Sequence, residues 1–115
     1  MHLVRSGEAP AYEAPGHQGM QMRYLQGRDA GPTQSVWIGL SVIEPGGGTS
    51  SAVSSVEKFY VLVEGELEVT AIEGGRTRTE TLRPLDSCRI APGESRQLSN
   101  RSDRPASVLL VMPQG

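Results

Sequence analysis

The chain has 115 residues and a formal net charge of −2, a length that suits one domain and a charge that gives nucleic-acid binding little support. Its one cysteine, Cys88, excludes an internal disulfide and fits a reducing compartment. No apolar stretch reaches the roughly 18 residues of a membrane span, and the polar N-terminus lacks the apolar core of a signal peptide. We therefore expect a cytoplasmic protein that acts without a membrane or a nucleic acid.

Residues 1–33 are rich in polar side chains, with three prolines and five glycines in GEAPAYEAPGHQGMQMRYLQGRDAGPT. Such a composition favours turns and extended backbone, and one short strand is predicted over 20–25. The segment is too polar to fold alone. We expect an N-terminal arm over 1–33 that packs on the body of the domain, 34–115, or on a partner subunit.

From residue 35 the apolar residues alternate with a period of two, the pattern of β-strands. The segment SVWIGLSVI places Val36, Ile38, Leu40 and Val42 on one face and Trp37 on the other. Glycine-rich turns such as EPGGGT, Glu-Gly and Glu-Gly-Gly separate the strands. Further strands are predicted over 58–63, 66–72, 77–82, 87–90, 96–100 and 106–112. No long segment shows a helical period, so the sequence predicts an all-β sandwich or barrel.

The order of these strands and turns resembles a small single-domain cupin of the RmlC-like type over 35–112. The resemblance is carried by PGGGT, by the hairpin FYVLVEGELEV, and by LDSCRIAPGESRQLSN, which ends at Asn100. In the family pattern a Pro-Gly-Gly turn precedes two histidines, a glutamate and the hairpin, and a Pro-Pro-Gly turn precedes a histidine and an asparagine. The resemblance implies a cupin-type jelly-roll β-barrel over 34–115 with an extended N-terminal arm, and a homodimer in which N-terminal residues cross over.

The resemblance also implies a metal site in the barrel, whose four ligand positions fall by spacing on Ala52, Ser54, Lys58 and Arg96. A divalent transition metal needs three or four imidazole, thiolate or carboxylate donors. Alanine has no donor, serine is a poor one, and the two cations repel a metal ion. We therefore expect no bound metal and no other cofactor.

Other metal ligands are scarce in this chain. The histidines are His2 and His17, both in the N-terminal arm. A metal site formed by His17, Glu57 and Cys88 is an alternative that no spacing supports. We expect Cys88 to be a packing residue, since free cysteine is commonly buried.

The strand EKFYVL can present either of two faces to the barrel interior, because a shift of one residue exchanges the faces of a strand. Counted from the hairpin glycine Gly65, Lys58 and Tyr60 point inward. Counted from the aromatic pair, with Val63 as an added residue in a bulge, Glu57 points inward and Lys58 is solvated. The sequence leaves both registers open.

Arg96 is expected to face the cavity in either register. Beside Lys58 it forms a pair of buried cations, which require a counter-charge or a bound anion. A guanidinium also matches a carboxylate or phosphate through two parallel hydrogen bonds. Beside Glu57, in contrast, Arg96 has an internal partner. The first arrangement predicts a site for a small anionic metabolite, with Ser54 and Tyr60 as further contacts.

Two other functions remain open alternatives. The first is a metal-free enzyme of isomerase or lyase type, in which Lys58, desolvated beside Arg96, acts as a base or forms an imine and Tyr60 acts as an acid. His17 is either an exposed turn residue or, with the arm folded across the barrel mouth, a cap of the cavity that titrates near neutral pH. The second is a structural or regulatory subunit whose barrel is filled by side chains.

The sequence thus predicts a metal-independent homodimeric barrel that binds a small anionic metabolite in its cavity, with enzymatic activity undecided. The candidate ligand-binding residues are Lys58, Tyr60, Arg96, Ser54, His17 and Glu57.

Overall fold

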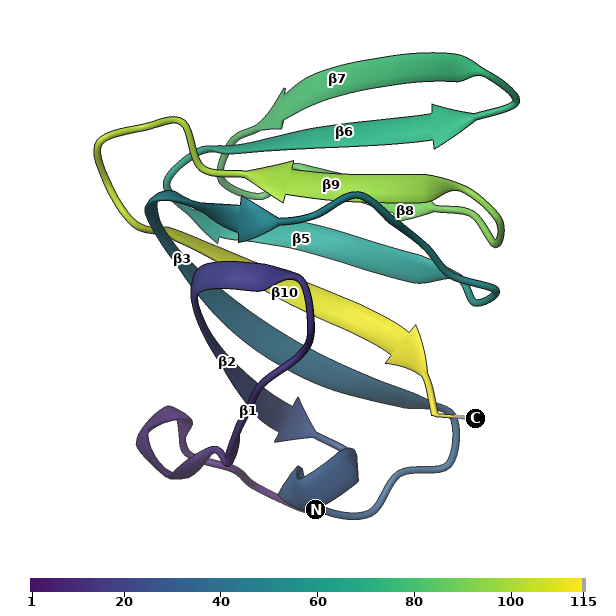
Figure 1. Cartoon of the computed structure of the whole chain (residues 1–115). Helices are drawn as coiled ribbons and strands as arrows, with labels where there is room; N and C mark the ends of the chain where they lie inside the picture. The colour runs from purple at the N-terminus through teal and green to yellow at the C-terminus, as the bar shows by residue number, and fades with distance from the viewer. Residues whose placement is uncertain (115) are drawn as a thin grey trace.

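The computed structural model describes residues 1–114, and almost all of their regular structure is β-strand (Figure 1). The all-β prediction is therefore confirmed. Beside two short 3₁₀ turns, η1 (Ser6–Glu8) and η2 (Arg28–Ala30), the strands are β1 (Ala11–Tyr12), β2 (His17–Gln26), β3 (Val36–Thr49), β4 (Ala52–Val53), β5 (Lys58–Glu64), β6 (Leu67–Glu73), β7 (Arg76–Leu82), β8 (Ser87–Ile90), β9 (Ser95–Ser99) and β10 (Ala106–Pro113).

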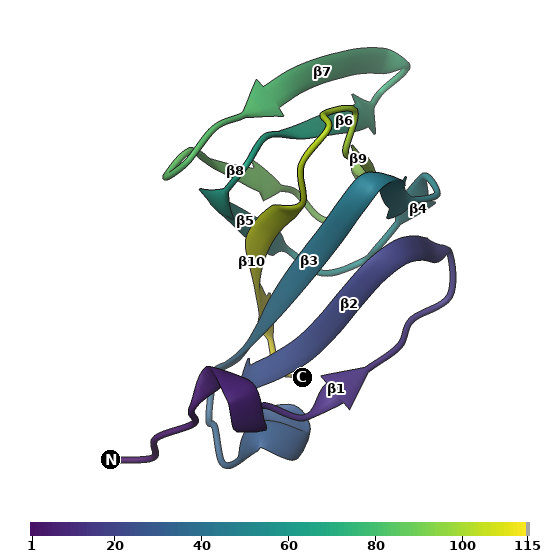
Figure 2. The same ribbon diagram turned by 90° about the vertical axis from the view of Figure 1, so that its left-hand side faces the viewer.

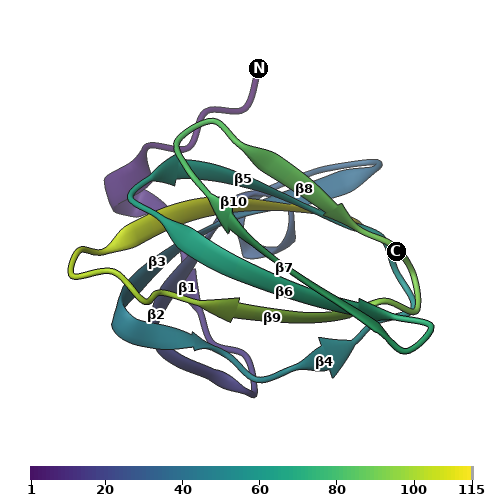
Figure 3. The ribbon, with the colours of Figure 1, turned by 90° about the horizontal axis from the view of Figure 1, so that it is seen from above.

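The strands form one sheet that curls into a nearly closed barrel. Its order is β7-β6-β9-β3-β10-β5-β8, with β2 and β1 added beside β3, and β4 beside β9. Seen from above, β5 and β8 lie across from β6 and β9, and β7 and β8 are the two ends of the curled sheet (Figure 3). Curling in this way leaves few sheet edges open to other chains. The barrel prediction is confirmed.

The long strand β3 shows how alternation defines the interior. Trp37, Ser41 and Ile43 are buried on one face, whereas the aliphatic side chains between them are only half-buried. The face that carries Trp37 thus lines the barrel, and the aliphatic face from Val36 to Val42 points outward. The main hydrophobic core does not include Trp37. It lies around Ile43, Leu62 and other buried aliphatic residues of β5, β6 and β10.

The N-terminal arm is more regular than its composition suggests. The strand predicted over 20–25 is β2, which has ten residues and pairs antiparallel with β3. β1 adds to the outer edge of β2 (Figure 2), and Arg23 Nη1 donates a hydrogen bond to the carbonyl of Ala9 at 2.7 Å. Residues of the arm therefore belong to the same sheet as the barrel of their own chain.

The hairpin between β5 and β6 requires its glycine. Gly65 has φ of 82°, in the left-handed region that glycine adopts without steric cost, and a Cβ there would lie 2.6 Å from the carbonyl oxygen of Pro105. The turn fixes where β5 ends, and with it the position from which inward-facing residues are counted.

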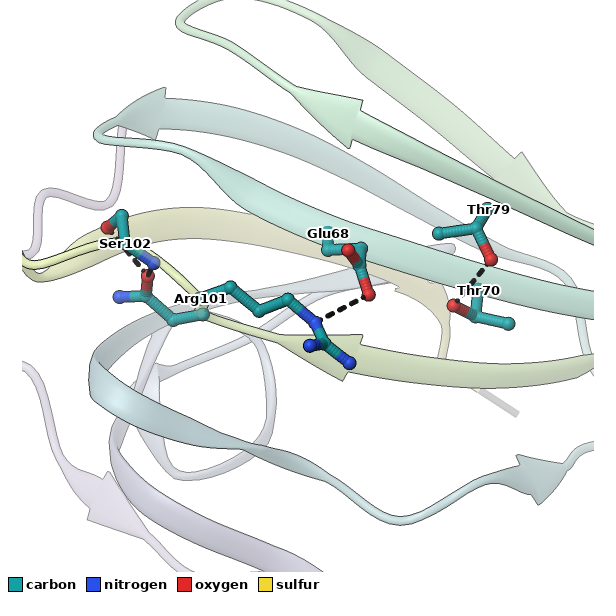
Figure 4. A network of polar contacts seen from close by, with 6 residues as sticks. Glu68, Thr70, Thr79, Arg101 and Ser102 are labelled. Atoms are coloured by element: carbon teal, nitrogen blue, oxygen red, sulfur yellow. Dashed lines mark hydrogen bonds and ion pairs between the residues drawn. The ribbon is translucent and has the colours of Figure 1, made fainter.

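Asn100 ties together the connection between β9 and β10. It is 1% exposed, and its Nδ2 donates to the carbonyls of Ile43 and Arg104 at 2.9 and 2.7 Å. Its Oδ1 accepts hydrogen bonds from the backbone N–H and the hydroxyl of Ser102. Figure 4 shows this corner, where Arg101 also reaches Glu68 on β6 at 3.0 Å. The asparagine of the sequence motif is thus a structural residue.

We expect Asn100→Ala to lower the free energy of unfolding by about 2–4 kcal/mol, because buried backbone groups lose their partners. Urea denaturation measures the loss. Ser102→Ala removes part of the same network at a more exposed position and serves as the control with a smaller expected effect. An unchanged midpoint in Asn100→Ala would contradict the structural role.

Within residues 1–114 there is no helix with the length and apolar character that crossing a membrane requires.

Candidate functional site

A cavity of about 250 Å³ lies between the N-terminal arm and the inner faces of β3, β5, β9 and β10. The arm contributes Tyr12, Glu13, His17 and Tyr24, and the barrel contributes Trp37, Lys58, Tyr60 and Arg96. Its presence argues against a barrel filled entirely by side chains. Another hollow, of about 320 Å³ over Gly46 to Gly48, has no ionisable side chain in its lining.

The register of β5 places Lys58 in this cavity. Lys58, Tyr60 and Leu62 are buried, whereas Phe59 is 39% exposed on the opposite face. The expected bulge at Val63 exists, because Leu62 pairs with Val108 and the next pair joins Glu64 to Ser107. It lies after the inward-facing residues, however, and does not change which face they occupy.

The alternative register, with Glu57 inward, is wrong. The Glu57 carboxylate lies outside the barrel, where its Oε2 accepts a hydrogen bond from Arg89 Nε on β8. Ser54 does not reach the cavity either. Its hydroxyl accepts a hydrogen bond from the backbone N–H of Val56 at 3.2 Å, since the loop before β5 turns back on itself there.

Arg96 on β9 is 5% exposed and only partly satisfied. Its Nη1 donates to Thr49 Oγ1 at 2.7 Å and to the carbonyl of Ser50 at 3.3 Å. Its Nε is buried and has no hydrogen-bond acceptor among the described residues. A buried donor without a partner costs free energy, so the Arg96 side chain has fewer hydrogen bonds than its burial calls for.

The cations Lys58, Arg96 and Arg28 outnumber Glu13, the one carboxylate among the described residues that line the cavity. The four ion pairs within residues 1–114 join arginines and glutamates on the outer surface, and neither Lys58 nor Arg96 takes part. Burial, and secondarily the charge of Arg96, lower the pKa of Lys58 below its ordinary value. Burial raises the pKa of Tyr60, although Arg96 acts in the opposite direction, so Tyr60 presents a neutral phenol.

An aromatic wall forms the opposite side of the cavity. The rings of Tyr12 and Tyr24 stack with centroids 4.1 Å apart, and Trp37 packs edge-on against both. Burial, with smaller contributions from Tyr24 and Tyr60, raises the pKa of Tyr12 to about 12. Trp37 Nε1 is a second buried donor without a partner among the described residues. From the sequence, Trp37 and Tyr24 could each belong to the core, a cavity wall or a dimer surface, and Tyr12 was not singled out.

His17 lies at the cavity, as expected if the arm crosses the barrel mouth. Its Nδ1 donates to the carbonyl of Pro15 at 2.7 Å. Glu13 and Arg28 also line the cavity, and the Arg28 guanidinium lies 5.5 Å from the Trp37 ring centre, within the range of a cation–π contact. None of these additional residues was singled out from the sequence.

The residues at the family's metal positions do not fit a divalent metal. Two of them are the buried cations Lys58 and Arg96, and Ala52 is an exposed residue of β4 that pairs with Arg96. No group of three histidine, cysteine or acidic side chains suited to a metal occurs within residues 1–114. The alternative set is not assembled, because Glu57 lies outside the barrel and Cys88 lines a different hollow, near Glu94.

Comparison with known proteins gives matches of three kinds. The family described as "Cupin domain" matches residues 39–112. A Mycobacterium tuberculosis protein named beta-D-galactosidase Rv1717 is 44% identical over 112 residues, which cover 97% of this chain and 93% of that protein.

Among solved structures, the polyketide cyclase RemF from Streptomyces resistomycificus has a TM-score of 0.86 at 21% identity, covering 100% of this chain and 80% of that one. An RmlC-like cupin from Shewanella frigidimarina has a TM-score of 0.77 at 14% identity, covering 100% and 92%. At these identities the two structures show a shared fold.

Proposed function

The chain belongs to the cupin family, with the jelly-roll barrel that its motifs predicted, and from this premise we propose that it binds a small anionic metabolite in the barrel cavity without a metal. The observation that supports the proposal is the pair of buried cations, Lys58 and Arg96, which has no acidic partner among the described residues. Two like charges in such a place repel each other, and a bound anion relieves that repulsion.

The hydrogen-bonding character of the cavity supports the same class of ligand. The Arg96 guanidinium, the Lys58 side chain and the Tyr60 phenol are hydrogen-bond donors of residues that line the cavity. A carboxylate or phosphate offers several acceptor oxygens in a small volume. The cavity volume of about 250 Å³ is below that of typical drug-sized pockets, so the ligand has few non-hydrogen atoms. The one free cysteine supports a cytoplasmic location for this activity.

A thermal-shift series on chelator-treated protein tests the proposal with acetate, pyruvate, lactate and inorganic phosphate as probes. A ligand that binds only the folded state raises the unfolding free energy by RT ln(1 + [L]/Kd). We expect concentration-dependent stabilisation by at least one of these anions, unchanged by chelator. No shift with any of them, or a shift that appears only when a divalent metal is added, would contradict metal-free anion binding.

Hydrolysis of a β-galactoside is a second candidate function, favoured by the 44% identity to the mycobacterial protein of that name. Most glycosidases use two carboxylates, whereas Glu13 is the one carboxylate that lines this cavity among the described residues. Such a reaction would therefore need Glu13 together with His17 or a tyrosine.

Under this second function, Glu13→Gln should lower kcat/KM for nitrophenyl β-D-galactoside by about 100-fold or more, the size of a general acid–base contribution. Glu8→Gln, an exposed carboxylate of η1 outside the cavity, is the matched control and should keep the wild-type rate. Equal rates in both variants would remove Glu13 from the reaction, and no hydrolysis by wild-type protein would leave anion binding as the function.

We also propose that the protein is a homodimer, with a second copy on the outer face of β3, β10 and β5. These strands lie side by side (Figure 2) and present an apolar surface made of Val36, Ile38, Leu40, Val42, Phe59, Val61, Val63, Leu109 and Val111. Val36, Phe59 and Val63 of this surface are exposed, and exposed apolar side chains that lie together mark interaction sites. A face without charges favours an equally apolar partner. Sedimentation equilibrium should give twice the chain mass, and a monomer at all concentrations would contradict the proposal.

A further inference from the structure

Lys58 is the only lysine of the chain, whereas the other ten basic side chains of Lys and Arg type are arginines. That single lysine lies in the cavity at 9% exposure, beside Arg96. We propose that Lys58 is a carbonyl-reactive amine, which forms an imine with a small oxo acid whose carboxylate is held by Arg96. This inference rests on the proposed anion site and specifies its ligand as an anion that carries an aldehyde or ketone.

The choice of lysine at this position is informative because arginine would hold an anion at least as well. A guanidinium is always charged and matches a carboxylate with two donors, whereas an ammonium is a point charge. The property that distinguishes lysine is that its amine can lose its proton and attack a carbonyl carbon. Arg96 already supplies the guanidinium in this cavity, so what a lysine adds, beside its charge when protonated, is an amine that becomes a nucleophile when it loses its proton.

The surroundings of Lys58 favour the neutral amine. Within residues 1–114 it has no acidic ion-pair partner, and its strand neighbour across β8 is the apolar Ile90. Burial and the Arg96 charge lower its pKa, which increases the fraction of amine that is free to react near neutral pH. The other titratable groups of the cavity are Tyr60, Tyr12, Tyr24, Glu13, His17 and Arg28.

The condensation balances without an oxidant or a reductant. The neutral amine of Lys58 adds to the carbonyl carbon and forms a carbinolamine. The C–O bond then breaks, and the oxygen leaves as water. The nitrogen and carbon become joined by a double bond, and protonation gives an iminium ion, for which the Tyr60 phenol and His17 are the nearby proton carriers. The iminium withdraws electrons from the adjacent carbon, a step common to lyase and decarboxylase chemistry.

Reductive trapping on the full-length wild-type protein tests the inference. The protein is incubated with pyruvate, glyoxylate or 4-oxopentanoate and sodium cyanoborohydride at neutral pH, and adducts are located by intact mass and peptide mapping. The fully exposed N-terminal amine of Met1 is the other primary amine and acts as an internal reference. With at least one oxo acid we expect Lys58 labelling that saturates with concentration and exceeds N-terminal labelling about tenfold or more, because a bound carbonyl is held at the amine.

Two comparisons separate a specific imine from general amine chemistry. Lactate, which has a hydroxyl in place of the carbonyl of pyruvate, should protect Lys58 and leave the N-terminus unprotected. Arg96→Met should abolish the excess labelling, while Arg89→Met, which removes an exposed arginine of β8, should keep it. Labelling of Lys58 at or below the level of the N-terminus, or without protection by lactate, would overturn the inference.

The two proposals fail differently. If lactate or pyruvate stabilises the folded protein but Lys58 is not trapped, anion binding stands and the imine does not. If no anion stabilises the protein and Lys58 is not trapped, the anion site itself fails and the imine with it.

Discussion

We expect Arg96→Met to lower the affinity of the cavity for its best anion by about 30-fold to several thousandfold, which corresponds to the roughly 2–5 kcal/mol lost when one member of a buried charged pair is removed. The structural reason is that Arg96 is a buried cation in the lining of the cavity and has no ion-pair partner among the described residues. Methionine keeps the apolar stem of the side chain and removes every donor. Calorimetric titration of chelator-treated protein measures the change.

Arg89→Met is the matched control for this prediction. Arg89 lies on the neighbouring barrel wall, but its side chain is 55% exposed and pairs with Glu57 on the outside. Its replacement removes the same charge from the chain, so general electrostatic attraction falls equally in both variants. A similar loss of affinity in both would mean that anions are attracted by net charge alone and that the cavity is not the site.

The second large effect is a gain in stability. Without a ligand, Lys58 places a second positive charge beside Arg96 in a buried site. We expect Lys58→Met to raise the free energy of unfolding near neutral pH by about 1–4 kcal/mol, the range seen when buried charges are replaced by apolar side chains of similar size. The same variant should lose anion binding. Chemical denaturation of both proteins without added anions measures the gain.

The pH dependence of this gain follows from the lowered pKa of Lys58. The unfolded chain binds the proton more tightly, with the ordinary value of 10.5, than the folded chain does. Below the folded-state pKa of Lys58, the folded protein therefore loses the full free energy that burying the charged ammonium costs. This loss of stability disappears as the pH rises through the folded-state pKa toward 10.5. The stability difference between Lys58→Met and wild type should shrink over this window, while Tyr12, Tyr60 and Cys88 titrate in both proteins. A difference that stays constant with pH would contradict a charged, desolvated Lys58.

The barrel itself was predictable from the sequence because its signals are local. Alternating apolar residues define each strand, and glycines such as Gly65 mark turns that no other residue enters without strain. The strand predicted over 87–90 has the same first and last residues as β8, Ser87–Ile90. The strand over 20–25 was predicted short because its ends, at His17 and Gln26, are polar residues whose strand conformation comes from pairing with β3.

The site was less predictable because it depends on contacts between distant parts of the chain. Local pattern alone could not choose between Lys58 and Glu57, since the outward face of β5 is the more apolar one. An apolar outward face is unexpected for a monomer and is consistent with the proposed dimer. The aromatic wall joins Tyr12 and Tyr24 from the arm to Trp37. No spacing of residues in the sequence predicts these contacts between the arm and the cavity.

Calorimetric titration of pyruvate and inorganic phosphate into chelator-treated wild-type protein tests metal-free anion binding most directly. We predict saturable binding of at least one of them with one site per chain, and an affinity that does not change when zinc or manganese is added back. Binding that is absent in the chelator-treated protein and restored by either metal would contradict it.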